Sequence, residues 1–301
     1  MTQRNEFPTH DKTILADPDI DFEISPFTMN TGCTISDIEA PHQHDFYVIQ
    51  YVRQGTGRHV IDFQSYDMAP GTLFLLSPGQ IHFWEPTGAI DGSILVFTED
   101  FFIAPPAHLA DIHDLAFFHT FLQSPQLKLR PEDIGVFEEL FGLISREFEN
   151  QKDGYASALR AFLHVLLVNI QRTYTHTDQG EKSQAEPSLV RRFKHLVSEN
   201  FGSERSIQFY ANQLGTSISS LNNTIKTVTG NTPGGILRQH IIMEAKRLLA
   251  NTEMTASEVG YHLKFDDPSY FGRFFRRETG TSISTFRNDV RQKYIVFHKP
   301  A

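Results

Sequence analysis

The chain contains one cysteine, Cys33, among 301 residues. A single thiol excludes both an intramolecular disulfide and a multi-cysteine zinc site. No stretch approaches the ~18 uncharged apolar residues that a membrane span needs, and the polar residues 1–19 lack the apolar segment of a secretion signal. We therefore expect a cytoplasmic protein with no membrane partner, in which Cys33 packs as a small side chain.

Excess positive charge is also absent overall, because the net charge is −9, but the charge is unevenly distributed. Residues 1–185 carry 11 Lys and Arg against 26 Asp and Glu, a net charge of −15. Residues 186–301 carry 16 against 10, a net charge of +6. A basic half of this size is what binding to DNA phosphates requires, although a solvated face without a partner explains the charge equally well.

Short alternating apolar runs separated by turn residues fill residues 22–98. The runs include FYVIQYV, HVIDF and GSILVF, with GTG and APG between strands. This pattern is typical of a β-barrel or sandwich. From about residue 108 the periodicity becomes helical, with one face formed by Leu109, Ile112, Leu115 and Ala116 and two longer segments at 132–149 and 155–173.

The helical segments after the strands have two interpretations. They pack against the barrel, or they also pair with a second copy to form a homodimer. The following stretch THTDQGEKSQAEP is polar, lacks periodicity and ends in proline. We therefore predict a domain of residues 1–174, a linker of residues 175–187 and an all-α domain of residues 188–301.

The C-terminal half repeats itself with a shift of 50 residues, after a one-residue indel that aligns Leu214 with Leu263. Each copy reads as a short helix, a tight turn, a second helix and a terminating glycine, which is the helix-turn-helix unit. The matched positions of the second helices are Ser219, Leu221, Asn223, Ile225, Lys226 and Gly230 with Ser269, Phe271, Arg273, Phe275, Arg276 and Gly280.

The second helix of the second copy lies in KFDDPSYFGRFFRRETG, which carries five aromatic residues and three arginines. Asp267 is a good N-cap, Pro268 suits the first helical position and Gly280 suits a left-handed end, so the helix should run from 268 to 279. At ~100° per residue, three phenylalanines share a core face and the arginines share the opposite face. The core phenylalanines are Phe271, Phe274 and Phe275.

These residues resemble the DNA-binding domain of the AraC/XylS family of bacterial transcription regulators. The resemblance covers about residues 189–290 and includes the family signature of an aromatic residue followed by Phe, two basic residues and Gly. It implies two helix-turn-helix units joined by a long helix, each placing a recognition helix in the major groove of promoter DNA. By position it assigns base contacts to Ser219, Asn222, Asn223, Pro268, Ser269 and Arg273, and phosphate contacts to Lys226, Arg276 and Arg277.

Four residues depart from the family pattern. Lys264 stands where the family has glycine in the turn, which costs about 1 kcal/mol if that residue needs a positive φ. Gly260 replaces an alanine, Ile241 replaces an arginine and Ile283 replaces a proline. None of them is a recognition residue, so the expected fold and DNA contacts stand.

Residues 41–84 resemble the cupin-like sensor barrel of the same family. Enzymatic cupins bind a metal through His-x-His, a glutamate and a later histidine, and here His42, His44 and His82 are present without the glutamate. We predict no cofactor and no enzymatic activity, although three histidines can hold zinc or iron. The residues expected to supply a small-molecule effector pocket are His42, His44, Arg53, His59, His82 and Trp84.

The sequence thus predicts a homodimeric, DNA-binding transcription regulator, with a cupin-like effector-binding and dimerisation domain before the AraC-type DNA-binding domain. The first alternative is a metal-dependent cupin enzyme with a helical appendage. The second is a constitutive DNA-binding protein that senses no ligand.

Overall fold

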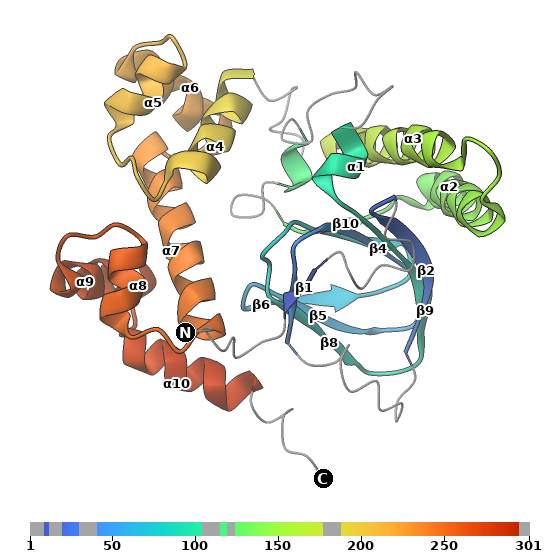
Figure 1. The fold of residues 1–301 in the computed structure, drawn as a ribbon, viewed down its shortest axis with the longest axis horizontal. Helices are drawn as coiled ribbons and strands as arrows, with labels where there is room; N and C mark the ends of the chain where they lie inside the picture. Colours follow the sequence, from blue (N-terminus) through green and yellow to red (C-terminus); the bar gives the residue numbers. More distant parts are fainter. Residues whose placement is uncertain are drawn as a thin grey trace. The chain divides into compact units, whose positions relative to one another are not determined.

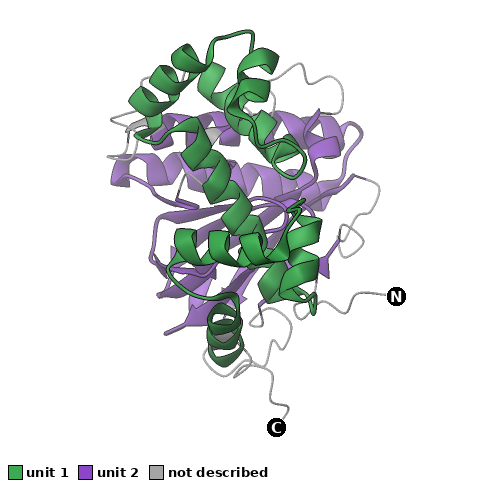
Figure 2. Cartoon of the chain, turned by 90° about the vertical axis from the view of Figure 1, so that its left-hand side faces the viewer, with its two compact units in different colours: residues 1–8, 186–301 green, residues 9–185 purple. Residues whose placement is uncertain are grey.

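The computed structural model describes residues 9–11, 20–29, 41–103, 115–118, 124–176 and 188–294. The chain divides into two compact units (Figure 2). The barrel unit comprises residues 9–185, and the helical unit comprises residues 186–301 together with residues 1–8. Sheet dominates the first and helix the second (Figure 1), which confirms the predicted two-domain fold class.

The strands of the barrel unit form two larger sheets and one small one. The five-stranded sheet has the order β10-β7-β4-β9-β2, from β2 (Phe22–Met29), β4 (Tyr47–Gln54), β7 (Thr72–Leu76), β9 (Ile90–Phe97) and β10 (Gln126–Lys128). The three-stranded sheet has the order β6-β5-β8, from β5 (Gly57–Ile61), β6 (Gln64–Met68) and β8 (His82–Pro86). The short strands β1 (Thr9–His10) and β3 (Gln43–His44) pair in parallel.

The five-stranded sheet is buried on both faces, which explains its continuous apolar runs. Along β4, Val48 and Val52 join a core between the two larger sheets. Ile49 and Tyr51, on the alternate face, join a second core with the helices. The first of these cores also contains residues of the three-stranded sheet, such as Trp84 on β8, so the sheets enclose the barrel interior.

The helices of the barrel unit cover one face of the five-stranded sheet (Figure 1). They are α1 (Glu99–Ile103), the 3₁₀ turn η3 (Ala116–Phe118), α2 (Pro131–Asn150) and α3 (Tyr155–His176). The two longer segments predicted from periodicity are therefore helices, and Tyr51 stacks on Phe141 of α2 with 5.4 Å between ring centroids. Of the first predicted face, Leu109 and Ile112 lie outside the described residues.

The helical unit contains seven helices in its described part, residues 188–294. They are α4 (Ser188–Asn200), α5 (Ile207–Gln213), α6 (Ile218–Thr229), α7 (Pro233–Asn251), α8 (Ala256–His262), α9 (Pro268–Thr279) and α10 (Ile283–Tyr294). The linker at residues 175–187 remains a prediction. Helix α3 continues to His176, and residues 177–187 lie outside the described residues. Among the described helices, none has the length and apolar character needed to cross a membrane.

Candidate nucleic-acid interface and histidine cluster

The sequence repeat is a structural repeat. The helices α6 and α9 begin and end with the predicted offset of 50 residues, whereas α5 and α8 are offset by 49. The extra residue lies in the second turn, where the indel was predicted. The two units α5–α6 and α8–α9 are therefore helix-turn-helix units on either side of the long helix α7.

Local side chains set the ends of both second helices. The Ser217 hydroxyl accepts a hydrogen bond from the Ser220 amide at 3.1 Å, and the Asp267 carboxylate accepts one from the Ser269 amide at 2.8 Å. Gly230 and Gly280 end the helices with φ of 74° and 78°. These contacts satisfy backbone groups that a helix end would otherwise leave unpaired. For α9 they confirm the predicted span from 268 to 279.

The phenylalanines of α9 form core, as predicted. Phe271 and Phe275 are fully buried, and Phe274 is 5% exposed. Phe265, from the turn, packs on Phe271 and Phe274 with ring centroids 5.1 and 5.2 Å away. Because the phenylalanine face of α9 packs in the core, the opposite face, which carries the arginines, is exposed to solvent.

The predicted base-contacting residues occupy the outward faces of α6 and α9. Ser219, Asn223 and Ser269 are exposed, and Pro268 is half-buried. Arg273 has 69% of its side chain exposed, against 58% for Arg277, and its guanidinium lies 3.6 Å from the Asp267 carboxylate. These residues are available to reach bases.

Two predicted DNA contacts are already engaged within the chain. The Asn222 amide donates to the Ile218 carbonyl of its own helix at 2.9 Å. Arg277 pairs with Glu278 at 2.8 Å. Lys226 and Arg276 are exposed, so they are the better placed phosphate contacts.

The turn of the second unit carries the strain predicted from the sequence. Lys264 has a φ of 59°, and Gly215, at the equivalent turn position of the first unit, has a φ of 64°. Both turns make the same hydrogen bond back to the third residue before them, at 2.9 Å for Lys264 and 3.0 Å for Gly215. Arg205 supports the second turn by donating to the Leu263 carbonyl and by lying 3.7 Å above the Phe265 ring.

Replacing Lys264 by glycine is expected to stabilise the helical unit by about 0.5–1 kcal/mol. Removing the strain of a non-glycine residue in the left-handed conformation stabilises the folded state by about 1–2 kcal/mol. Glycine also gives the unfolded chain more conformational freedom, which offsets about 0.4–1 kcal/mol of this gain. Urea denaturation of the full chain followed by far-UV circular dichroism measures the change. The reciprocal Gly215→Lys should destabilise by a similar amount, and a neutral result for both would contradict the strain.

The other departures from the family pattern fit their surroundings. A β-carbon on Gly260 would lie 3.2 Å from Phe271, so glycine lets this ring pack directly on the α8 backbone. Ile241 is 3% exposed and belongs to the core of α7. Ile283 is half-buried at the start of α10.

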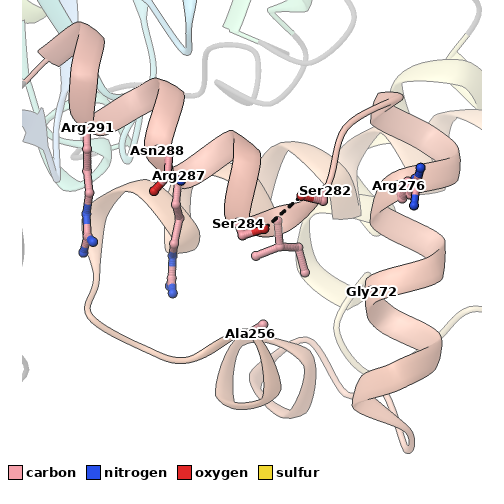
Figure 3. Close-up of a pocket in the computed structure, with 9 residues that line it drawn as sticks. Ala256, Gly272, Arg276, Ser282, Ser284, Arg287, Asn288 and Arg291 are labelled. Carbon is pink, nitrogen blue, oxygen red and sulfur yellow. Dashed lines mark hydrogen bonds between the residues drawn. The ribbon is translucent and has the colours of Figure 1, made fainter.

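A groove beside Arg276 was not predicted from the sequence, because its lining residues come from three separate helices, α8, α9 and α10. Its volume is about 470 Å³, and the close-up shows Arg276 and the side chains of α10 on opposite sides (Figure 3). Ser282 caps α10 by accepting from the Thr285 amide at 3.1 Å. The polar and basic lining residues are Arg276, Ser282, Ser284, Arg287, Asn288 and Arg291, which suits an anion such as phosphate.

In the barrel unit, four histidine rings lie together. Ring centroids are separated by 4.3 Å between His42 and His82, 4.8 Å between His42 and His44, and 5.0 Å between His44 and His82. His10 lies 5.3 Å from His42 and 5.6 Å from His44. Backbone bonds fix the arrangement, since His42 and His82 exchange N–H···O bonds of 3.0 and 2.8 Å and β1 pairs His10 with His44.

Two buried hydrogen bonds extend from this cluster into the barrel interior. The His59 Nε2 and His82 Nδ1 atoms are 3.0 Å apart, and the Trp84 Nε1 donates to the Gln50 Oε1 at 3.0 Å. Among the described residues of the barrel unit, four buried side-chain nitrogens have no hydrogen-bond partner: His44 Nδ1, Gln50 Nε2, His59 Nδ1 and His82 Nε2. Such atoms are costly in a folded interior unless a ligand or ion meets them.

Burial favours the neutral imidazoles of His44, His59 and His82. It lowers the pKa of His44 to about 2, with the nearby His42 and His10 acting in the same direction. The pKa values of His59 and His82 are also held well below the usual value by burial, and then by neighbouring histidines. Neutral rings carry a lone pair that can accept a hydrogen bond or bind a metal.

The structure brings five of the six predicted pocket residues together and leaves one apart. His42, His44, His59, His82 and Trp84 contact one another. Arg53 instead pairs with Asp91 at 2.9 Å, with 39% of its side chain exposed. Arg53 lies where the register between β4 and β9 shifts, between Val52 and Gln54. The sequence pattern does not predict this shift. His10 was missed because a two-residue strand has no periodicity.

Two family models match this chain. Residues 32–167 match the AraC-like ligand binding domain, and residues 210–289 match a helix-turn-helix domain. The HTH-type transcriptional activator RhaS of Escherichia coli O157:H7 is 26% identical over 254 residues, which cover 83% of this chain and 87% of that protein.

Two solved structures also align with this chain. ToxT from Vibrio cholerae O395 covers 89% of this chain and 97% of its own, at 13% identity and a TM-score of 0.42. The DNA-binding domain of AdpA in complex with a target DNA covers 35% of this chain and 94% of its own, at 22% identity and a TM-score of 0.32.

Proposed function

The chain belongs to the AraC family of transcriptional regulators, and on this premise we propose that Arg273 reads a base of promoter DNA while Lys226 and Arg276 bind its phosphates. A ligand-binding domain and a DNA-binding helix-turn-helix domain are what the family provides. The observation that carries the proposal is the pair of capped second helices with exposed polar faces. We also propose that the chain acts in the cytoplasm by binding promoter DNA and catalyses no reaction.

The remaining predicted contacts have distinct places in this proposal. Ser219 and Asn223 read bases from α6, and Pro268 and Ser269 do so from the first turn of α9. Asn222 contributes only after its amide leaves the Ile218 carbonyl, and Arg277 only after it leaves Glu278. The groove between α9 and α10 is proposed to receive a further backbone phosphate, held by Arg276 and Arg291.

Selection from a pool of randomised duplex DNA tests the assignment. The purified full chain should enrich one sequence motif, and its affinity for that motif should fall steeply with salt, as counterion release requires. If the protein enriches no motif, it binds DNA without sequence preference, and the proposal that its side chains read bases is wrong. Comparing the protein with and without candidate effectors in the same selection reports whether a ligand changes DNA binding.

We place the small-molecule effector at the histidine cluster and in the adjoining barrel interior. His59, His82 and Trp84 offer polar atoms on an otherwise apolar core, a combination typical of ligand sites. Arg53 is left out of this site, since it pairs with Asp91 away from the cluster. A thermal-shift screen is the direct measurement, since a ligand at 100 times its dissociation constant adds ~2.7 kcal/mol to stability.

A homodimer through the helices of the barrel unit is part of the proposal. Helix α2 buries Phe137, Phe141 and other apolar residues, yet it also exposes Val136 by 46% and Leu143 by 37%. Val165 on α3 is 44% exposed. Val136 and Leu143 are two helical turns apart on one face, as expected for a helical contact between two copies.

The double substitution Val136→Glu with Leu143→Glu is expected to convert a dimer into a monomer. Buried charge without a partner is strongly unfavourable in a helix interface. Sedimentation velocity of the full chain measures the change. Glu149→Lys is the control, because it alters charge on the exposed side of α2 away from this face. A monomeric parent protein, or a dimer that survives the double substitution, would rule out this interface.

A further inference from the structure

We propose that His42, His44 and His82, with His10 as a fourth ring, bind a divalent transition-metal ion of the zinc class. This extends the proposed function by naming a metal as a ligand of the barrel unit. It does not depend on DNA binding, which is measured separately.

The positions of the rings carry the proposal. His42, His44 and His82 each offer one ring nitrogen, and the three atoms lie within 4.8 Å of one another. Imidazoles around a tetrahedral zinc ion, with Zn–N bonds of about 2.0–2.1 Å, have ring centroids roughly 5 Å apart. Five of the six pairs among the four rings have centroid separations from 4.3 to 5.6 Å, which bracket this value.

The unpartnered nitrogens give an independent reason. His44 Nδ1 and His82 Nε2 are buried and make no hydrogen bond within the described residues. Both belong to the set of rings that would surround the ion. Metal coordination uses the lone pair of such an imidazole nitrogen directly.

His59 has a separate, positioning role. Metal-binding histidines usually donate their second ring N–H to a fixed acceptor, which sets the tautomer and the orientation of the ring. With Nε2 of His82 on the metal, its Nδ1–H donates to the His59 Nε2, 3.0 Å away. His59 then carries its own proton on Nδ1.

The ligand set selects the class of metal. All four side chains offer nitrogen, and His42, His44 and His82 form the described metal-compatible cluster without a carboxylate. Calcium and magnesium prefer oxygen ligands, whereas imidazole suits zinc, copper, iron and nickel. The fourth ring distinguishes this arrangement from the three-histidine-plus-glutamate set of enzymatic cupins.

The test uses the full chain, stripped of metal by a chelator and dialysed. Titration with Zn²⁺ against a chromophoric competitor is expected to give one bound ion per chain, and Co²⁺ should develop the visible absorption of a tetrahedral nitrogen site. His44→Gln and His82→Gln should each lower affinity about 100-fold or more, because a ligand of a tetrahedral set is lost. His10→Ala should lower it as well.

Two further variants separate metal binding from a structural effect. His59→Phe should weaken Zn²⁺ binding about 10–100-fold yet keep one ion per chain, as loss of a supporting hydrogen bond does. His262→Gln, on the exposed surface of α8, should bind like the parent.

Two results would overturn the proposal, and the first of them needs no variant. One is a parent protein that takes up neither ion at micromolar concentration. The other is uptake that is lost in His262→Gln and retained in His44→Gln and His82→Gln. DNA affinity of the stripped parent protein is measured alongside, so failure of metal binding and failure of DNA recognition are told apart.

Discussion

Phe271→Ala is expected to destabilise the helical unit by about 3–5 kcal/mol, the usual cost of removing a buried phenylalanine. Phe271 is fully buried and contacts Phe265, Phe275 and the backbone at Gly260. Its loss leaves a cavity between α8 and α9, which the neighbouring rings can fill only in part. DNA binding should fall with it, because α9 would no longer be held in place.

Urea denaturation with two probes isolates this effect. Far-UV circular dichroism follows the helices, and fluorescence of Trp84, the sole tryptophan, follows the barrel unit. The first probe should shift to lower urea and the second should not. Tyr261→Ala is the matched control, since Tyr261 is 57% exposed on α8 and surface substitutions usually change stability by less than about 0.5 kcal/mol. Equal shifts for both variants would contradict the core role of Phe271.

Arg273→Ala should cost about 1–3 kcal/mol at the cognate DNA site and relax the preference at one base pair. The exposed guanidinium of Arg273 gives up a 3.6 Å contact with Asp267 and a position 5.9 Å from the centroid of the Tyr270 ring when it turns to a base. Both are weak contacts at an exposed site, so little free energy is lost. Arg276→Ala should weaken all sequences alike and reduce the salt slope by about 1, as removal of a phosphate contact does.

Binding isotherms on cognate and scrambled duplexes, each at several salt concentrations, distinguish the two arginines. Lys152→Ala removes an exposed positive charge from the barrel unit and should leave both isotherms unchanged. Losses from Arg273→Ala and Arg276→Ala that are equal on both duplexes would refute base reading by Arg273.

The helical unit could be predicted closely because its signals are local. Ser217, Asp267 and Gly280 mark helix ends through groups a few residues away, and the 50-residue repeat supplies a second copy of each signal. The family pattern has glycine where this chain has Lys264, which pointed to a positive φ at that turn, and Lys264 has a φ of 59°. The groove beside Arg276 could not be found in this way, since three helices separated in sequence line it.

The barrel site was only partly predictable, because it depends on contacts between distant strands. His42 and His44 are two residues apart, with His44 on β3 and His42 directly before this strand. Their grouping with His82 was expected from the family resemblance. The place of His10 depends on β1 pairing with β3, and that of Arg53 on an irregular β4–β9 register. Neither feature leaves a periodic signal in the chain.

Arg205 and α7 together limit how the chain can use DNA. The single helix α7 joins the two helix-turn-helix units, and Arg205, which precedes the first unit, holds the turn of the second through Leu263 and Phe265. The two recognition helices therefore meet the duplex at one fixed spacing. Each base pair inserted between their half-sites rotates one site by about 34–36°, so an operator must keep the half-sites in helical phase to engage both units.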